Sequence, residues 1–320
     1  MRRVGVIANP VSGHDVRRIS ALASTRSNLE KVQLLARVLR GMAGVGVGEV
    51  VLFPDSLGIT RAAAELAPGI AVRMLEAELV ASPTDTLSGA ARLADEVDVI
   101  VALGGDGTQR LVAESAPDVA LLPLAGGTNN AFGFEAEGTL AGMAVGYLVQ
   151  DERLWDGLRR VKRAHVEVDG APAGAALADA IVLRRAFVGA GALTDAAQFA
   201  EAVLPFAAPG NLGVTSVAGL VHPVGRHEPN GIHLVFGGER TVRAAIAPGR
   251  VEAVPLISLA PVSLGERVTF APLDGVLALD GEALMHFSRD QRIEASVACD
   301  GPFLVDPHAV LEVRRAKFEG

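Results

Sequence analysis

The chain has 320 residues, 50% of them hydrophobic and 21% charged, and its formal net charge is −8. This length allows two domains with separate cores, and the composition excludes a disordered chain. Because the chain is acidic overall and its basic residues are dispersed, we expect neither nucleic acid nor an anionic membrane surface as a partner.

The sequence also bears on the expected cellular location. No apolar stretch approaches the roughly 20 residues that a spanning helix needs, and Met1-Arg2-Arg3 precedes a short strand rather than a long apolar region. We therefore expect a cytoplasmic protein that makes no membrane contact. Cys299 is the only cysteine, which excludes an intrachain disulfide and a thiolate metal cluster.

The first half of the chain alternates apolar strand patterns with helical ones. The helix predicted over Asn28 to Met42 has an apolar face formed by Leu29, Val32, Leu35 or Ala36, Leu39 and Met42. Ser82-Pro83-Thr84-Asp85 forms a capped start for a helix through Ala94. This order implies an α/β domain with a doubly wound, mostly parallel sheet. The predicted strands are Val4 to Ala8, Glu49 to Phe53, Ala71 to Leu75, Val97 to Leu103 and Val119 to Leu124.

The fourth strand runs into the motif G-G-D-G-T, at a strand-to-helix corner. Glycines at such a corner let a phosphate approach the backbone N–H groups, so Gly104, Gly105, Gly107 and Thr108 are candidate phosphate ligands. Asp106 beside a polyphosphate would have to hold a metal ion or accept the proton of an attacking hydroxyl. Alone, the motif fits a Gly-Asp-Gly turn equally well.

Two further corners favour phosphate chemistry, because the carboxyl ends of parallel strands face one crevice. The first strand ends in N-P-V-S-G, and the fifth opens into A-G-G-T-N-N-A-F-G. The candidate phosphate or nucleotide ligands in these two loops are Asn9, Ser12, Gly13, Gly126, Gly127, Thr128, Asn129 and Asn130.

After about residue 150 the pattern changes to short strands and turns, which predicts a β-rich second domain. We therefore divide the chain into an α/β nucleotide-binding domain (1–150) and a β-rich substrate domain (151–302). Three histidines, His222, His227 and His233, lack the spacing of a metal site.

N-P-x-S-G, G-G-D-G-T and P-L-x-G-G-T-N-N together resemble the superfamily of NAD kinases and the diacylglycerol and sphingosine lipid kinases. Gly5 to Arg18 and Phe187 to Ala190 are most similar to the NAD-kinase-like proteins of acetoin catabolism, the acetoin-catabolism X proteins. The resemblance implies that residues 303–320 return to the first domain.

The resemblance also implies roles for residues of the second domain. Asp179 matches the acidic position of the dinucleotide-binding segment of NAD kinases, whereas Ala178 replaces its amide residue. Thr215 and Ser216 match a small-residue loop near the nicotinamide half of the substrate, and Glu282 lies in an L-D-G-E segment like that of the lipid kinases. Each of these segments also fits a turn or a strand end, and Asp280-Gly281 fits a two-residue hairpin.

These observations predict an ATP- and Mg²⁺-dependent kinase that binds its substrates between two domains, with NAD as the expected acceptor and a homo-oligomeric state. Asp106 would accept the proton or position the hydroxyl. The chain has no G-x-x-x-x-G-K-[ST] motif, which excludes a P-loop kinase. Two alternatives stay open. One is a lipid or other small-molecule kinase, although lipid kinases continue as G-G-D-G-T-x-N-E where this chain has Gln109-Arg110. The other is a non-catalytic nucleotide-binding regulator, which Ala178 favours.

Overall fold

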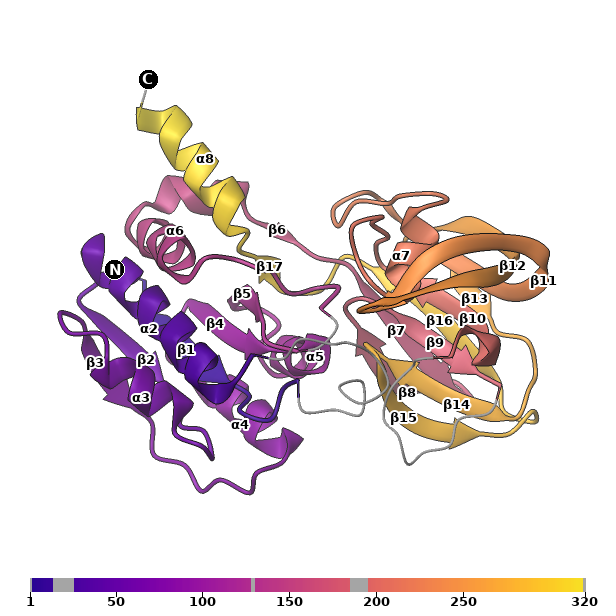
Figure 1. The fold of residues 1–320 in the computed structure, drawn as a ribbon, viewed down its shortest axis with the longest axis horizontal. Helices are drawn as coiled ribbons and strands as arrows, with labels where there is room; N and C mark the ends of the chain where they lie inside the picture. Colours follow the sequence, from indigo (N-terminus) through magenta and orange to yellow (C-terminus); the bar gives the residue numbers. More distant parts are fainter. Residues whose placement is uncertain (1, 14–25, 128–129, 185–194, 319–320) are drawn as a thin grey trace.

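A computed structural model describes residues 2–13, 26–127, 130–184 and 195–318. Two domains lie side by side and are connected by two chain segments (Figure 1). The first domain is built on a seven-stranded sheet in the order β3-β2-β1-β4-β5-β17-β6. Its strands are β1 (Val4–Ala8), β2 (Glu49–Leu52), β3 (Ala71–Met74), β4 (Val99–Gly104), β5 (Ala120–Ala125), β6 (Arg159–Arg160) and β17 (Phe303–Leu304).

Helices cover both faces of this sheet, which confirms the doubly wound α/β fold class. In β1, Val4 and Val6 pack on one face against α2, α3, α6 and α8, whereas Ile7 packs on the other against α4 and α5. The helices are α2 (Asn28–Gly44), α3 (Ile59–Glu65), α4 (Pro83–Ala94), α5 (Asp106–Ser115), α6 (Gly138–Gln150) and α8 (Pro307–Phe318).

Local sequence signals located several element boundaries. The side chain of Ser82 accepts a hydrogen bond from Thr84 N, and Pro83 begins α4 as predicted. The predicted apolar face of α2 was wrong at its first residue, because Leu29 is 65% exposed. Leu35, Leu39 and Met42 are buried as predicted, and the buried side of the helix also carries Lys31, Leu34 and Val38.

The second domain is β-rich and antiparallel, as predicted. A six-stranded sheet has the order β12-β11-β10-β9-β14-β15, and a four-stranded sheet has the order β13-β16-β7-β8. Their strands are β7 (Arg163–Val168), β8 (Ala171–Ala176), β9 (Ala180–Leu183), β10 (Phe199–Leu204), β11 (Asn230–Ala247), β12 (Arg250–Ser263), β13 (Arg267–Thr269), β14 (Gly275–Leu279), β15 (Glu282–Phe287) and β16 (Ile293–Ala298), with helix α7 (Val214–Gly219) and the 3-10 turn η2 (Ala196–Gln198). The 3-10 turn η1 (Glu152–Gly157) belongs to the first domain, where it packs against α6 and α8.

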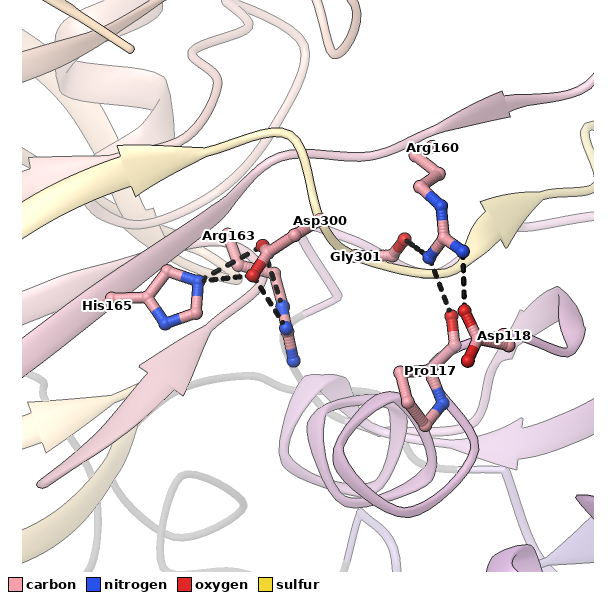
Figure 2. Close-up of polar contacts among 7 residues, drawn as sticks. All are labelled: Pro117, Asp118, Arg160, Arg163, His165, Asp300 and Gly301. Carbon is pink, nitrogen blue, oxygen red and sulfur yellow. Dashed lines mark hydrogen bonds and ion pairs between the residues drawn. The ribbon is translucent and has the colours of Figure 1, made fainter. Parts of the chain in front are cut away.

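The chain crosses between the domains twice, after β6 and before β17, and charged side chains join the two crossings (Figure 2). Arg163 donates two hydrogen bonds to the carboxylate of Asp300, at 3.1 and 2.9 Å, and His165 Nε2 lies 3.0 Å from the same group. Arg160 donates to Gly301 O at 3.1 Å and to Asp118 Oδ1 at 2.5 Å. The returning segment is thereby fixed to both domains.

The C-terminal segment completes the first sheet. Leu304 of β17 pairs with Leu121 of β5 in parallel, and Phe303 pairs with Arg160 of β6 in antiparallel. Helix α8 then packs beside α6 (Figure 1). Within the described residues, no helix combines the length and the apolar character that crossing a membrane would require.

Candidate functional site

Three glycine-containing loops meet at the carboxyl edge of the first sheet. The side chain of Asn9 donates to Thr108 Oγ1 at 2.9 Å, which links the loop after β1 to the start of α5. Ser12 Oγ donates to Gly126 O at 3.1 Å, which links the same loop to the one after β5. These contacts bring together candidate residues that lie up to 114 positions apart in the sequence.

A buried lysine that the sequence analysis missed supports the loop after β1. Lys31 Nζ donates to Pro10 O at 2.7 Å and to Ser12 O at 2.8 Å. Burial lowers the pKa of Lys31 to about 8. The signal that could have found it is its helical spacing to Leu34 and Val38, which places a cation on the buried face of α2.

The loop after β4 packs directly on the loop after β5. A Cβ at Gly127 would lie 2.8 Å from the Cα of Gly105, so this contact requires glycine. Helix α5 begins at Asp106, inside the G-G-D-G-T motif, with Gly105 as its N-cap. The first backbone N–H groups of a helix have no intrahelical acceptor, so they are available to an anion here.

The carboxylate of Asp106 has a clear structural role in this arrangement. It is buried and accepts hydrogen bonds from Ala131 N at 2.7 Å, Phe132 N at 3.0 Å and Gly133 N at 3.4 Å. Burial raises the pKa of Asp106, while these hydrogen bonds and the nearby Arg226 act in the opposite direction. Asp106 thus fixes the course of the loop after β5.

The side-chain amide of Asn130 is engaged within its own loop. Its Oδ1 accepts from Gly127 N and its Nδ2 donates to Gly127 O, both at 3.0 Å, so its amide closes the loop on itself. The expectation that Asn130 orients a sugar or phosphate oxygen therefore has no support from its present contacts. The other candidates in this loop, Thr128 and Asn129, and the segment Phe187 to Ala190 lie outside the described residues.

Gln109 and Arg110, which follow G-G-D-G-T directly, both have defined partners. Gln109 is fully buried and donates to Ala102 O at 3.0 Å and Leu124 O at 3.3 Å, which ties β4 to β5. The guanidinium of Arg110 lies 3.1 Å from the carboxylate of Glu282. This pair connects the first domain to the β14–β15 hairpin.

Asp280 is the buried member of an interdomain group of charges. Its carboxylate accepts from Leu177 N and Ala178 N and lies 3.8 Å from Arg110. Burial, together with the neighbouring acid Asp179, raises the pKa of Asp280 to about 8. Asp179 is partly buried beside it, and Asp280 N donates to Asp179 O at 2.9 Å.

The L-D-G-E segment serves both as a turn and as part of the site. Asp280 and Gly281 have φ angles of 52° and 78°, and Leu279 pairs with Glu282 across them, as in a two-residue hairpin. The carboxylate of Glu282 lies over Gly107, where a Cβ would come within 2.3 Å of it. Glu282 therefore reaches the start of α5 from the second domain.

A cavity of about 110 Å³ lies beside the linked loops. Its walls combine apolar side chains at the ends of β1 and β2 with polar groups from the starts of α4 and α5. The lining residues that matter here are Ile7, Asn9, Phe53, Thr86, Thr108, Leu111 and Glu282.

Two of the expected substrate residues do not reach this site. Thr215 and Ser216 are buried in the second domain, and the hydroxyl of Thr215 donates to Leu212 O at 3.0 Å. They lie on α7, which packs against β11, so they stabilise that domain instead. The contacts to the glycine loop come from Asn211 and Arg226, which both donate to Ala131 O.

In the described part of the chain, the ionisable side chains of the site are not arranged as a metal-binding centre. Among the described residues, no group of three or more histidines, cysteines or carboxylates has the arrangement needed to hold a metal ion. Magnesium commonly uses one or two carboxylates together with substrate phosphates, so Glu282 remains the side chain best placed for such a role.

Comparison with known proteins defines the class and then the family. Residues 59–145 match the diacylglycerol kinase catalytic domain, so this part of the first domain is similar to the catalytic domain of that class of kinases. Residues 162–300 match the C-terminal domain of acetoin catabolism protein X. The chain is 34% identical over 312 residues to acetoin catabolism protein X of Cupriavidus necator, which covers 92% of this chain and 87% of that protein. The chain belongs to the acetoin catabolism protein X family.

A solved structure with a similar arrangement is that of a diacylglycerol kinase from Bacillus anthracis str. Sterne. The similarity covers 97% of this chain and 98% of that one, with a TM-score of 0.48 and 12% sequence identity. The resemblance inferred from the sequence motifs is confirmed at the level of the superfamily and the family.

Proposed function

We propose that this protein binds ATP at the carboxyl edge of the first sheet and transfers its terminal phosphoryl group to a hydroxyl acceptor. The observation that carries this proposal is the pair of side-chain contacts, Asn9 to Thr108 and Ser12 to Gly126, that joins three glycine loops. Phosphoryl transfer depends mainly on alignment and charge neutralisation, which backbone N–H groups at such loops can supply.

The residues present fit a nucleotide. The first backbone N–H groups of α5, which follow Gly105, are available to phosphates, and Phe53 and Leu111 give the neighbouring cavity apolar walls suited to a base. Glu282 at its rim is the side chain that would hold magnesium. When bound, Mg²⁺ would supply charge neutralisation between phosphate oxygens.

Asp106 is our candidate for proton transfer as well as for loop positioning. Its Oδ2 accepts one backbone N–H, from Ala131, which leaves a lone pair on that oxygen for a proton of the acceptor hydroxyl. Burial raises the pKa of Asp106, a change that improves a carboxylate as a proton acceptor near neutral pH.

NAD is our best single candidate for the acceptor, with Asp179 as its contact in the second domain. The superfamily motifs favour this choice. Ala178 weakens it, because its N–H group is bonded to Asp280 at 2.7 Å and its methyl group is buried. We further propose a cytoplasmic homo-oligomer that acts on a small molecule, without a nucleic-acid or membrane partner.

Two other functions follow from specific observations. A lipid kinase is favoured by the match of residues 59–145 to the diacylglycerol kinase catalytic domain. A regulator that binds nucleotide without phosphoryl transfer is favoured by the contacts of Glu282 and Asp106. Glu282 pairs with Arg110, and the carboxylate of Asp106 accepts hydrogen bonds from three backbone N–H groups.

Binding and transfer can be tested separately. ATP with Mg²⁺ should raise the melting temperature, because a ligand at a hundredfold excess over its Kd stabilises the folded state by roughly 2.7 kcal/mol. Thr108→Val should weaken this effect by removing the hydroxyl bonded to Asn9, whereas Thr139→Val, which lies on α6, serves as the matched control. No stabilisation of the wild type by any nucleotide at millimolar concentration would exclude the nucleotide site.

The acceptor requires a direct assay. Labelled ATP should be incubated with the protein and with NAD, NADH, small polyols or diacylglycerol in separate reactions. Labelled NADP would support the NAD-kinase proposal, and labelled phosphatidic acid would support the lipid-kinase alternative. Nucleotide binding by calorimetry without transfer to any acceptor would favour the regulator.

A further inference from the structure

A second cavity lies where the C-terminal helix meets the second domain. It is bounded by α8, η1 and the segment at Arg226, and it has a volume of about 430 Å³. This size falls within the range of small-molecule sites. None of its lining residues belongs to the cavity beside Thr108, so the two are separate.

The walls of this α8 cavity are mostly apolar. They come from the loop after β5, from η1, from β17 and from α8, elements that the return of the chain to the first sheet brings together (Figure 1). The apolar lining consists of Phe134, Leu154, Leu158, Leu304, Val310 and Val313.

The charged groups around the α8 cavity favour an anion. Two arginines, Arg159 and Arg226, line it together with a single carboxylate, that of Asp306, and Arg226 also lies near the buried carboxylate of Asp106 outside the lining. Asp306 is already engaged as the cap of α8, since its Oδ1 accepts from His308 N at 2.9 Å and Ala309 N at 3.2 Å. The side chains facing this space therefore carry more positive than negative charge.

Arg226 is only partly satisfied by the protein. Its Nη2 donates to Ala131 O at 3.0 Å and Phe132 O at 2.9 Å, and its guanidinium stacks 4.3 Å from the ring centre of Phe206. Among the described residues, Nη1 has no hydrogen-bond acceptor. A guanidinium has five N–H donors and binds carboxylates well, so an additional acceptor would be stabilising; because Nη1 is buried, such an acceptor reaches it through a shift of the Arg226 side chain.

We propose that the α8 cavity binds a small organic anion in which one carboxylate is attached to an apolar body. The carboxylate lies toward Arg226 and Arg159, and the apolar body contacts Leu154, Leu158 and Val310. This site is independent of the proposed kinase function, because neither the binding nor its measurement requires a nucleotide.

Arg226 also connects the α8 cavity to the glycine loop after β5. Arg226 holds the carbonyls of Ala131 and Phe132, and the N–H groups of these two residues donate to Asp106. An occupant that fixes the Arg226 side chain therefore also stabilises the loop after β5. The coupling is carried by direct hydrogen bonds rather than by a long pathway.

The chain contains a natural reporter for this site. Trp155 is its only tryptophan and lies in η1, next to the cavity residue Leu154, with its Nε1 donating to Leu148 O at 2.7 Å. Octanoate is a suitable probe, and octanol and octylamine are its neutral and cationic counterparts. We expect octanoate to change the fluorescence of Trp155 saturably and to bind more tightly than either counterpart in calorimetry.

Two substitutions at one position provide matched variants. Val313 lines the cavity and is 38% exposed, so either Glu or Lys can place its charge at the opening. Val313→Glu should weaken octanoate binding about fivefold or more, and Val313→Lys should preserve or strengthen it. Failure of wild type to bind millimolar octanoate, equal affinities of the two variants, or equal affinity for octanol would each overturn the site.

The link to the glycine loop has its own measurement. Octanoate should slow amide hydrogen exchange at Ala131 and Phe132 in the full chain without nucleotide. Unchanged exchange at saturating octanoate would overturn the coupling. Because ATP is absent from these experiments, their outcome is distinguishable from that of the proposed kinase function.

Discussion

The guanidinium of Arg110 lies 3.1 Å from the carboxylate of Glu282, 172 residues further along the chain. This contact ties the start of α5 to the β14–β15 hairpin of the other domain. In the lipid-kinase pattern G-G-D-G-T-x-N-E, asparagine stands at the position of Arg110. The substitution introduces a cation between two acids, Glu282 and Asp280, and so changes the charge balance beside the glycine loops.

Arg110→Met should destabilise the protein more than Glu282→Gln. Above about pH 8, where Asp280 is ionised, the Arg110 change leaves this buried carboxylate without its nearby cation, which costs about 1–3 kcal/mol. Glu282 is 55% exposed, and loss of an exposed pair costs at most about 1 kcal/mol. Urea unfolding of both variants measures the difference, and equal losses would contradict the assigned role of Asp280.

Asp106→Asn should reduce nucleotide affinity as well as any turnover. Both carboxylate oxygens accept backbone N–H groups, so either orientation of an asparagine amide places its NH₂ against a donor such as Ala131 N or Phe132 N. Asparagine keeps the size and most of the hydrogen bonding of aspartate, which by sequence alone predicts that affinity survives, but the contacts to Ala131 N and Phe132 N require a carboxylate.

A matched control for this substitution lies in the second domain. Asp169→Asn makes the same chemical change in the β7–β8 hairpin, where Asp169 accepts from Arg292 N. Calorimetry with ATP should show weaker binding for Asp106→Asn and unchanged binding for Asp169→Asn. Equal affinities of wild type and Asp106→Asn would exclude the loop-positioning role.

Lys31→Met should loosen the loop after β1. Methionine preserves the length and apolar packing of the side chain but removes the donors to Pro10 O and Ser12 O. We expect weaker nucleotide binding and faster amide exchange at Ser12. Lys162→Met, a similar loss at a buried lysine of the second domain, should reduce stability without speeding exchange at Ser12.

The Asp300 group in Figure 2 predicts a loss of stability in acid. Burial alone would raise the pKa of Asp300, but hydrogen bonds from Arg163 and His165 hold it below its ordinary value of 3.8. A depressed pKa contributes stability that is present above about pH 4 and is lost as pH falls through the native value.

Asp300→Asn should therefore flatten this acidic part of the stability curve. Because Asp300 is 45% exposed, the effect should not exceed about 1 kcal/mol. Asp118→Asn changes an 84% exposed partner of Arg160 and is the control. Urea titrations from pH 3 to pH 7 would contradict the assignment if wild type and Asp300→Asn lost stability in parallel.

The architecture of the first domain could be predicted from the sequence because its signals are local. Strand β1 has the predicted bounds, Val4–Ala8, and α4 begins at Pro83 after the predicted cap. The predicted apolar face of α2 was wrong at Leu29, which is exposed, and hydrophobic spacing alone did not identify the buried Lys31. Lys31 is buried only because a loop from elsewhere in the chain supplies carbonyl acceptors.

The convergence of the glycine loops could also be predicted, since parallel strands place their carboxyl ends together. The roles of the individual side chains in these loops could not be predicted from the sequence. Asp106 and Asn130 are engaged by the loop after β5, and Arg226 enters the site from a segment with no recognisable motif. Such contacts depend on the packing of two domains, which a residue pattern does not encode locally.

The late position of β17 in the chain affects how the protein is made. The first sheet includes Leu304, although β5 ends at Ala125, so the edge of β5 stays unpaired while the second domain is synthesised. At 5–20 residues per second this interval lasts roughly 10 to 35 s. An open strand edge can pair with other chains during that time. Moving residues 303–318 ahead of Val4 in a permuted gene would let the nascent first domain close its sheet before the second domain emerges from the ribosome.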